Sequence, residues 1–153
     1  MNLFHPNSLP PEGSERCETL LERPGLRVER IVSNRHRGSH WYDQPEDELV
    51  LLLRGDCTLE FERGAQLPAR APAELTAPLI ALLGQTAFPP QPPVQPAAPP
   101  EGPLLALSPG EPLLLPAHLR HRVRSAGLHS PAVFLCLFFE AQASQTFRKE
   151  LFP

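Results

Sequence analysis

The stretch ELVLLLRGDCTLEFE, residues 48–62, carries the strongest structural signal in this chain. Residues 48–54 contain a continuous apolar run, which is typical of a strand that is buried on both faces. Residues 57–62 alternate between apolar and polar side chains, as a strand with one apolar face does. Gly55-Asp56 lies between the two runs and predicts a tight hairpin connection. The stretch therefore predicts two strands joined by a short turn.

Similar strand signals lie on both sides of this stretch. Each is a short apolar or β-branched run, and turn residues such as Gly, Pro and Ser separate the runs. The further predicted strands are residues 26–33, 104–107, 112–115, 121–124 and 132–139. Short strands in pairs, with no convincing amphipathic helix before the tail, predict an all-β fold that forms an antiparallel barrel or sandwich.

A length of 153 residues predicts one domain, and a hydrophobic content of 41% is enough for a packed core. Proline is the unusual component, because the chain has 21 prolines and eight of them lie in residues 89–103. We therefore interpret residues 65–103 as a Pro-rich insertion outside the core. The remainder of the predicted single domain 1–153 is a core at about 26–63 and 104–139, an irregular N-terminal arm at 1–20 and a tail at 141–153.

The charge pattern argues against nucleic acid and membranes as partners. The net charge is −3, from 14 basic and 17 acidic residues, and the basic residues are scattered along the chain. The N-terminal residues show no basic segment followed by an apolar one, which is the pattern of a secretory signal. Cys17, Cys57 and Cys136 are an odd and widely spaced set, so we interpret them as reduced thiols. These features predict a cytoplasmic protein.

Two polar segments stand beside predicted strands. The first is HWYDQPEDE at residues 40–48, and the second is PAHLRHRV at residues 116–123. Because side chains alternate along a strand, Glu48 shares a face with every second residue of its apolar run, and His121 shares a face with Val123. Glu48 and His121 are therefore expected to project into the interior of the barrel.

The spacing of these segments resembles the two motifs of the cupin superfamily. Glu48 and Gly55 keep the spacing that ends the first motif, and Gly110, Pro116 and His121 keep the spacing of the second. The wider strings WYDQ and PAHLRHRV are also similar to those of a group of small single-domain cupins. The resemblance covers both core segments and implies a double-stranded β-helix, the jelly-roll barrel of cupins.

The same resemblance draws attention to a metal site, and here the chain departs from the family pattern. Metal-binding cupins carry a His-x-His sequence before the Glu of the first motif. Those two positions hold either Trp41 and Asp43 or Tyr42 and Gln44, depending on the alignment. Neither alignment supplies a histidine, so the usual set of three His and one Glu is degenerate.

The candidate ligands for a divalent metal are Glu48, His121, Asp43 and His118. Two imidazoles with one or two carboxylates suit Zn, Fe(II), Mn or Ni and leave coordination positions open for a substrate. The candidates for contacts with a small molecule are Trp41, Tyr42 and Gln44. A structural interpretation stays open for these residues, in which His121 bonds to Glu48 without a metal and the aromatic side chains only pack.

Three functions fit these residues, and whether the protein is an enzyme stays open. The prediction is a cupin that binds a divalent metal and a small molecule, with the reaction unassigned. The first alternative is a binding or sensing module without a metal. The second is an isomerase in which Glu48 and His121 transfer protons without a metal. The apolar runs at residues 49–53 and 132–139 need cover on their outer faces, which favours a homodimer.

Overall fold

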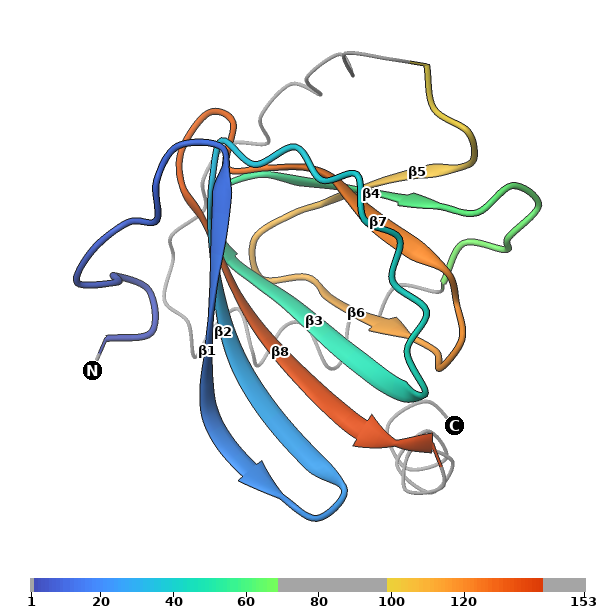
Figure 1. Ribbon diagram of the computed structural model, residues 1–153, viewed down its shortest axis with the longest axis horizontal. Helices are drawn as coiled ribbons and strands as arrows, with labels where there is room; N and C mark the ends of the chain where they lie inside the picture. The colour runs from blue at the N-terminus through green and yellow to red at the C-terminus, as the bar shows by residue number, and fades with distance from the viewer. Residues whose placement is uncertain (1, 69–98, 142–153) are drawn as a thin grey trace.

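The computed structural model describes residues 2–68 and 99–141, which form eight β-strands (Figure 1). Their bounds are β1 Ser14–Arg23, β2 Leu26–Asn34, β3 Glu46–Arg54, β4 Cys57–Phe61, β5 Leu104–Leu107, β6 Pro112–Leu115, β7 His121–Ala126 and β8 Ala132–Glu140. The strands make two antiparallel sheets, one in the order β1-β2-β8-β3-β6 and one in the order β5-β4-β7. The two sheets form a jelly-roll barrel, so the predicted all-β fold is confirmed.

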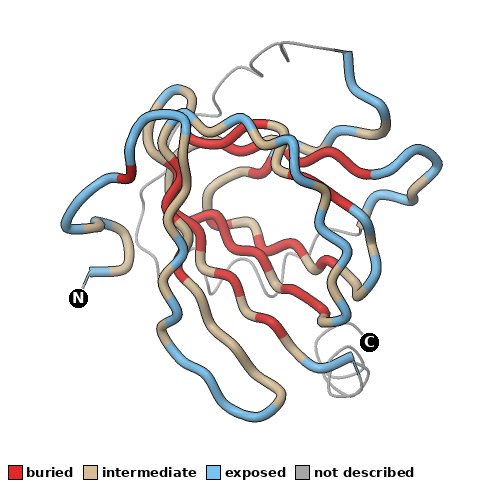
Figure 2. Tube along the Cα trace, in the orientation of Figure 1, coloured by how far each residue is buried: buried red, intermediate tan, exposed pale blue. Residues whose placement is uncertain are grey.

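Inward-facing residues of both sheets fill the closed part of the barrel. Val50 and Leu52 come from β3, and Leu59 and Phe61 come from β4. These four side chains are at most 5% exposed and belong to one buried apolar cluster. Figure 2 shows that the buried segments are concentrated on the strands of both sheets. The predicted apolar face of residues 57–62 is therefore confirmed.

The connection at Gly55-Asp56 corrects the predicted hairpin. β3 pairs with β6 and β8, whereas β4 pairs with β5 and β7, so these two residues carry the chain from one sheet to the other. Gly55 has a φ of +88°, and a Cβ atom there would lie 2.5 Å from Cα of Ala132. The Asp56 carboxylate accepts the backbone N–H groups of Leu128 and His129, at 3.0 Å each. Gly-Asp suits a hairpin and a corner between sheets equally well, because both need a tight turn with positive φ.

The N-terminal segment needs a second correction. Ser14–Arg23 is strand β1, which pairs with β2 at the edge of the larger sheet. The prediction of an irregular arm over residues 1–20 is therefore wrong from Ser14 onward. Most side chains of β1 are exposed or half-buried, because an edge strand has little apolar surface to cover. Because its sequence is largely polar, β1 lacks the apolar pattern from which strands are predicted.

The outer face of the larger sheet carries a smaller apolar cluster. Leu51 and Leu53 of β3 pack with Val133 of β8, and Leu3 and Phe4 pack against these three residues. The N-terminal residues of the same chain thus supply part of the cover that the apolar strands require. The homodimer stays a prediction.

Two predicted segments lie outside the described residues. They are residues 69–98 of the predicted Pro-rich insertion and residues 142–153 of the predicted tail. The described end of the insertion contacts the barrel, because the backbone N–H groups of Glu101 and Gly102 donate to Oε1 of Glu60. Among the described residues, no helix is long and apolar enough to cross a membrane.

Candidate functional site

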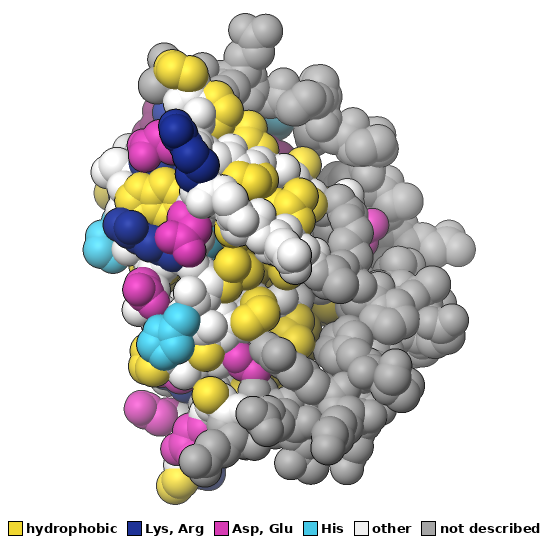
Figure 3. Space-filling view, turned by 90° about the vertical axis from the view of Figure 1, so that its right-hand side faces the viewer, with side chains coloured by type: hydrophobic (Ala, Val, Ile, Leu, Met, Phe, Trp, Pro, Cys, Tyr) yellow, Lys and Arg dark blue, Asp and Glu magenta, His cyan; other side chains and the backbone are white. Residues whose placement is uncertain are grey.

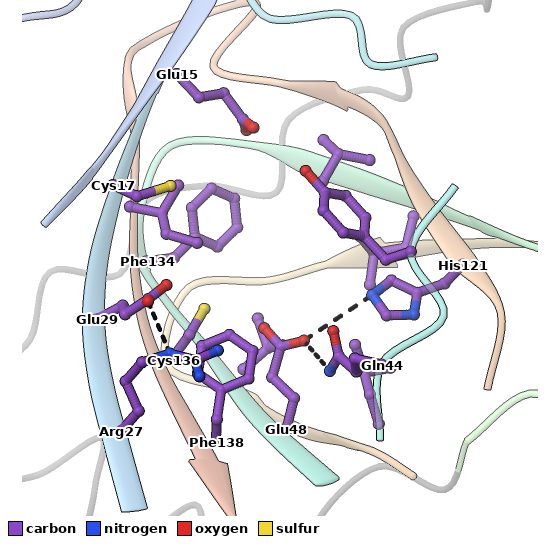
Figure 4. Close-up of a pocket in the computed structure, with 16 residues that line it drawn as sticks. Glu15, Cys17, Arg27, Glu29, Gln44, Glu48, His121, Phe134, Cys136 and Phe138 are labelled. Atoms are coloured by element: carbon purple, nitrogen blue, oxygen red, sulfur yellow. Dashed lines mark hydrogen bonds and ion pairs between the residues drawn. The ribbon is translucent and has the colours of Figure 1, made fainter. Parts of the chain in front are cut away.

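A cavity of about 230 Å³ lies inside the barrel (Figure 4). Much of its wall is apolar, and polar side chains reach into it from several strands. The polar, thiol and aromatic side chains of the wall are Glu15, Cys17, Arg27, Glu29, Tyr42, Gln44, Glu48, His121, Phe134, Cys136 and Phe138. An apolar cavity with a few convergent polar groups is the usual form of a binding site for a small molecule.

Glu48 extends from β3 into this cavity. The alternation of β3 turns it to the same side as Val50, as predicted. Its Oε2 accepts a hydrogen bond of 2.8 Å from Nε2 of Gln44, and the thiol of Cys136 also bonds to the carboxyl group. Burial raises the pKa of Glu48 above its usual range, and the bond from Gln44 and the nearby His121 offset only part of this effect. Burial therefore makes this carboxyl group harder to ionise than an exposed glutamate.

His121 begins β7 and faces Glu48. Its Nδ1 lies 2.8 Å from the carbonyl oxygen of Leu119, and this nitrogen carries the proton because a carbonyl group can only accept. In the neutral ring Nε2 then has a free lone pair, and it lies 3.9 Å from Oε2 of Glu48. This separation is longer than a hydrogen bond, so a ligand atom can contact both groups.

The segment before β3 is extended and runs beside β7. Backbone hydrogen bonds join Tyr42 and His121 in both directions, at 2.7 and 3.2 Å. Tyr42 and Gln44 line the cavity, and the period of two in an extended chain turns Trp41 and Asp43 away from it. Tyr42 and Gln44 are therefore the inward-facing residues of this segment, and they are one of the two pairs that the cupin resemblance places at the His-x-His positions.

Trp41, a candidate for contact with a small molecule, does not line the cavity. The guanidinium groups of Arg122 and Arg120 lie 4.5 Å and 5.4 Å from the centroid of its ring. Arg122 in turn donates a hydrogen bond of 3.0 Å to Glu60. Trp41 thus covers a buried ion pair by a cation–π contact, which agrees with the packing role that the sequence left open.

Asp43 and His118 also lie outside the cavity. Nδ1 of His118 is 3.1 Å from Oδ1 of Asp43, and the side chains are 72% and 58% exposed. The four predicted metal ligands are therefore not brought together, because only Glu48 and His121 face the cavity. In residues 2–68 and 99–141, no three His, Cys, Asp or Glu side chains are grouped to hold a metal ion.

The donors in the cavity fit a tightly bound metal poorly. Catalytic Zn and non-haem Fe sites have at least three protein ligands. The two inward positions of the segment before β3 supply a phenol from Tyr42 and an amide from Gln44 in place of two imidazoles. One carboxyl group and one imidazole remain, so the metal site of the cupin resemblance lacks half of its ligands.

The polar residues on one side of the cavity were not among those predicted from the sequence. Glu15 and Cys17 project from β1, and Arg27 and Glu29 project from β2 (Figure 4). Both pairs have the spacing of two residues that places side chains on one face of a strand. This spacing of two residues is itself a strand signal. Strands are recognised from apolar residues at that spacing, however, and both of these pairs contain charged residues.

Solved structures of similar shape agree with this architecture. A proposed mannose-6-phosphate isomerase from Ralstonia eutropha is 29% identical, with 92% of this chain and 97% of that chain covered and a TM-score of 0.57. A cupin superfamily protein from Desulfitobacterium hafniense is 14% identical, with 84% and 79% covered and a TM-score of 0.52. This chain has the cupin fold. A cupin 2 conserved barrel domain protein from Leptotrichia buccalis is 16% identical, with 84% and 42% covered and a TM-score of 0.52.

No protein-family model matches the sequence. No curated protein matches it at a significant level. The similarity to solved structures is thus what confirms the predicted cupin fold. Because one fold hosts many unrelated functions, the function has to follow from the side chains in the cavity.

Proposed function

We propose that this cupin-fold protein binds a small polar molecule inside its barrel, without a resident metal ion. The observation that carries the proposal is the cluster of Gln44, Glu48 and His121 in a largely apolar cavity. Of the residues predicted from the sequence to bind a metal or a ligand, only these three and Tyr42 line the cavity.

The three polar side chains offer complementary hydrogen bonds. Nε2 of His121 accepts in the neutral ring, and Glu48 accepts through its carboxyl oxygens or, when it is protonated, donates through its hydroxyl group. The carbonyl oxygen of Gln44 is a further acceptor, because the amide nitrogen already donates to Glu48. A hydroxyl or amino group of a ligand can therefore bond to several of these atoms, while its carbon skeleton packs on the apolar wall.

Proton transfer without a metal is the second candidate, and one observation favours it. A buried carboxyl group with a raised pKa lies 3.9 Å from an imidazole nitrogen that has a free lone pair. Two such groups can remove a proton from one atom of a bound molecule and return it to another, which is the chemistry of an isomerase. The similar Ralstonia eutropha protein carries the name of a proposed isomerase.

The metal-free part of the proposal is tested by elemental analysis. Tag-free protein is dialysed with Zn²⁺, Fe²⁺, Mn²⁺ and Ni²⁺ in separate experiments and then freed of unbound ions. We expect far less than one metal ion per chain. A stoichiometric metal that disappears in the Glu48→Gln/His121→Ala double variant would show instead that the site holds a metal.

The ligand site is tested by a thermal-shift screen of sugars, polyols, amines and hydroxy acids. A ligand of the cavity should raise the thermal midpoint of the wild type and of Glu62→Gln, which changes an exposed charge, but not that of Glu48→Gln or His121→Ala. Equal shifts in all four proteins would remove the cluster from the site. Deuterium incorporation into a bound ligand in D₂O, lost in Glu48→Gln and in His121→Ala, would favour the isomerase over a pure binding module.

A further inference from the structure

We propose that the cavity selects a small organic cation, a molecule with an ammonium group, and rejects anions such as phosphates and carboxylates. This inference rests on the proposed ligand-binding function and names the chemical class of the ligand. Two carboxylates line the cavity, from Glu15 and Glu29, and they face a single guanidinium group, from Arg27. The third carboxyl group, from Glu48, adds hydrogen-bonding oxygens, because burial disfavours its charged form. An anion that enters would meet like charges, whereas a cation would be attracted.

The carboxyl groups are well shielded from solvent. The side chains of Glu15 and Glu29 are 16% and 18% exposed. Charges in such positions are screened by salt much less than charges on an open surface. Their combined field is therefore effective inside the cavity.

Arg27 is already paired with carboxylates of the protein. Its Nε lies 2.8 Å from Oε1 of Glu29, and its Nη1 lies 3.3 Å from Oε1 of Glu46. The guanidinium group also lies over the ring of Phe138, 4.2 Å from the centroid. The one fixed positive charge on the wall is thus neutralised by carboxylates of the protein itself.

The uncharged groups of the wall also suit a donor-rich ligand. Nε2 of His121 accepts hydrogen bonds, and its side chain is only 6% exposed. No hydrogen bond from the described residues reaches this atom. The amide N–H of Gln44 is already used on Glu48, so the amide presents its oxygen. These two acceptors complement an ammonium or hydroxyl group better than a phosphate, which brings few hydrogen-bond donors.

An aromatic ring lies among these carboxyl groups. Phe134 stands beside Cys17 and Glu29 on the wall of the cavity (Figure 4). The face of an aromatic ring attracts a cation, and the attraction is stronger where water is excluded. Carboxylates and a ring on one wall form a suitable surface for an alkylammonium group.

Neighbouring titratable groups respond to the same negative charges. Burial, and after it the charges of Glu15 and Glu29, raise the pKa of the Cys17 thiol. Burial and then Glu15 raise the pKa of Tyr42. Ser33 donates a bond of 2.6 Å to Glu15, and Nε2 of His36 lies 3.5 Å from its other oxygen. These contacts hold the Glu15 carboxylate in place beside the cavity.

The first test uses three probes of one shape and different charge. They are choline, its uncharged isostere 3,3-dimethylbutan-1-ol, and the anion 3,3-dimethylbutanoate, and binding is measured by calorimetry. We expect choline to bind at least roughly tenfold more tightly than the uncharged isostere. The anion should show no binding in the millimolar range. Equal affinities for choline and the isostere, or no binding of choline, would overturn the inference.

Variants connect this preference to the cavity. Glu15→Gln and Glu29→Gln should each reduce the preference for choline, and Glu29→Gln should also permit some binding of the anion, because it releases Arg27 from one partner. The matched control is Glu62→Gln, which removes the same charge at an exposed position and should leave the preference unchanged. An equal effect of all three substitutions would show that net charge, and not the cavity, sets the preference.

The second test measures the electrostatic preference of the cavity without a bound ligand. Cys17 is exposed and lines the cavity, so its thiolate can displace sulfinate from methanethiosulfonates and form a mixed disulfide. We expect a trimethylammonium reagent to outpace a sulfonate reagent by a ratio roughly tenfold larger than with free cysteine, and Cys17→Ser to abolish the labelling. A ratio equal to that of free cysteine would overturn the inference. If the ratio is raised but the screen finds no ligand whose binding depends on Glu48, the proposed function fails while the inferred preference for cations stands.

Discussion

Glu48 and Glu60 are both buried glutamates of the barrel, but their surroundings are opposite. Glu60 on β4 is 0% exposed, and Arg122 and Arg124 lie 3.0 and 3.3 Å from its Oε2. Backbone N–H groups at residues 101–102 bond to its Oε1. Burial alone would raise the pKa of Glu60, but these hydrogen bonds and charges outweigh burial and lower it. Glu60 is therefore an ionised group whose bonding capacity is filled by the protein.

Glu48 has no such set of cations. It receives hydrogen bonds from an amide and a thiol, and its charged form is disfavoured by burial. The space beside it is a cavity rather than packed protein. The comparison teaches that burial of a carboxyl group does not by itself indicate function. A carboxyl group that the protein leaves partly unsatisfied beside a cavity does indicate it.

The largest expected effect on stability comes from a substitution of Glu60. Glu60→Gln removes the buried carboxylate that Arg122 and Arg124 share, while Arg122 keeps its contact with Glu101. We expect the free energy of unfolding to fall by roughly 3 kcal/mol, measured by denaturant titration at pH 7. The exposed neighbour Glu62→Gln is the control and should change it by less than about 0.5 kcal/mol. A stable Glu60→Gln protein would mean that the ion pairs contribute little.

Glu48→Gln should separate binding from stability. The substitution keeps the shape of the side chain but removes the carboxyl group that faces His121. We expect ligand binding to be lost while the free energy of unfolding at pH 7 changes by less than about 1 kcal/mol. A fall in stability as large as that of Glu60→Gln would show that Glu48 is structural.

The two carboxyl groups should respond to pH with opposite signs. The pKa of Glu60 is lowered on folding, so its stabilising contribution is present above the usual carboxyl range and is lost as the pH falls. The pKa of Glu48 is raised on folding, so its contribution is present at low pH and is lost as the pH rises through the folded value. Thermal midpoints from pH 4 to 8 should therefore show Glu60→Gln approaching the wild type at low pH. Glu48→Gln should gain on the wild type at high pH, and parallel curves would contradict both assignments.

The smallest expected effect concerns the exposed pair of His118 and Asp43. Both side chains are more than half exposed, and neither lines the cavity. His118→Ala should change the free energy of unfolding by less than about 1 kcal/mol and leave ligand binding unaltered. A loss of binding equal to that of His121→Ala would return His118 to the site. Because the backbone N–H of His118 also bonds to Gln44, an alanine that keeps this bond is the suitable substitution.

The charged residues on the surface do not indicate a binding site. Figure 3 shows basic, acidic and apolar side chains interspersed on one face. On that face acidic and basic side chains lie next to one another and not in separate patches. The informative charges are those turned inward, such as Glu15 and Glu29, and the sequence does not label them as different from the rest.

The sequence by itself determined where seven of the eight described strands lie and that Glu48 and His121 share the interior. Both follow from side-chain direction along a strand, which is a local property with a period of two residues. Tertiary structure decided the rest, because it depends on which distant segments pair. The bridge between Tyr42 and His121 turned Tyr42 and Gln44 inward. Pairing with β2 made a polar edge strand of β1 and brought its glutamate to the cavity, which no local pattern could show.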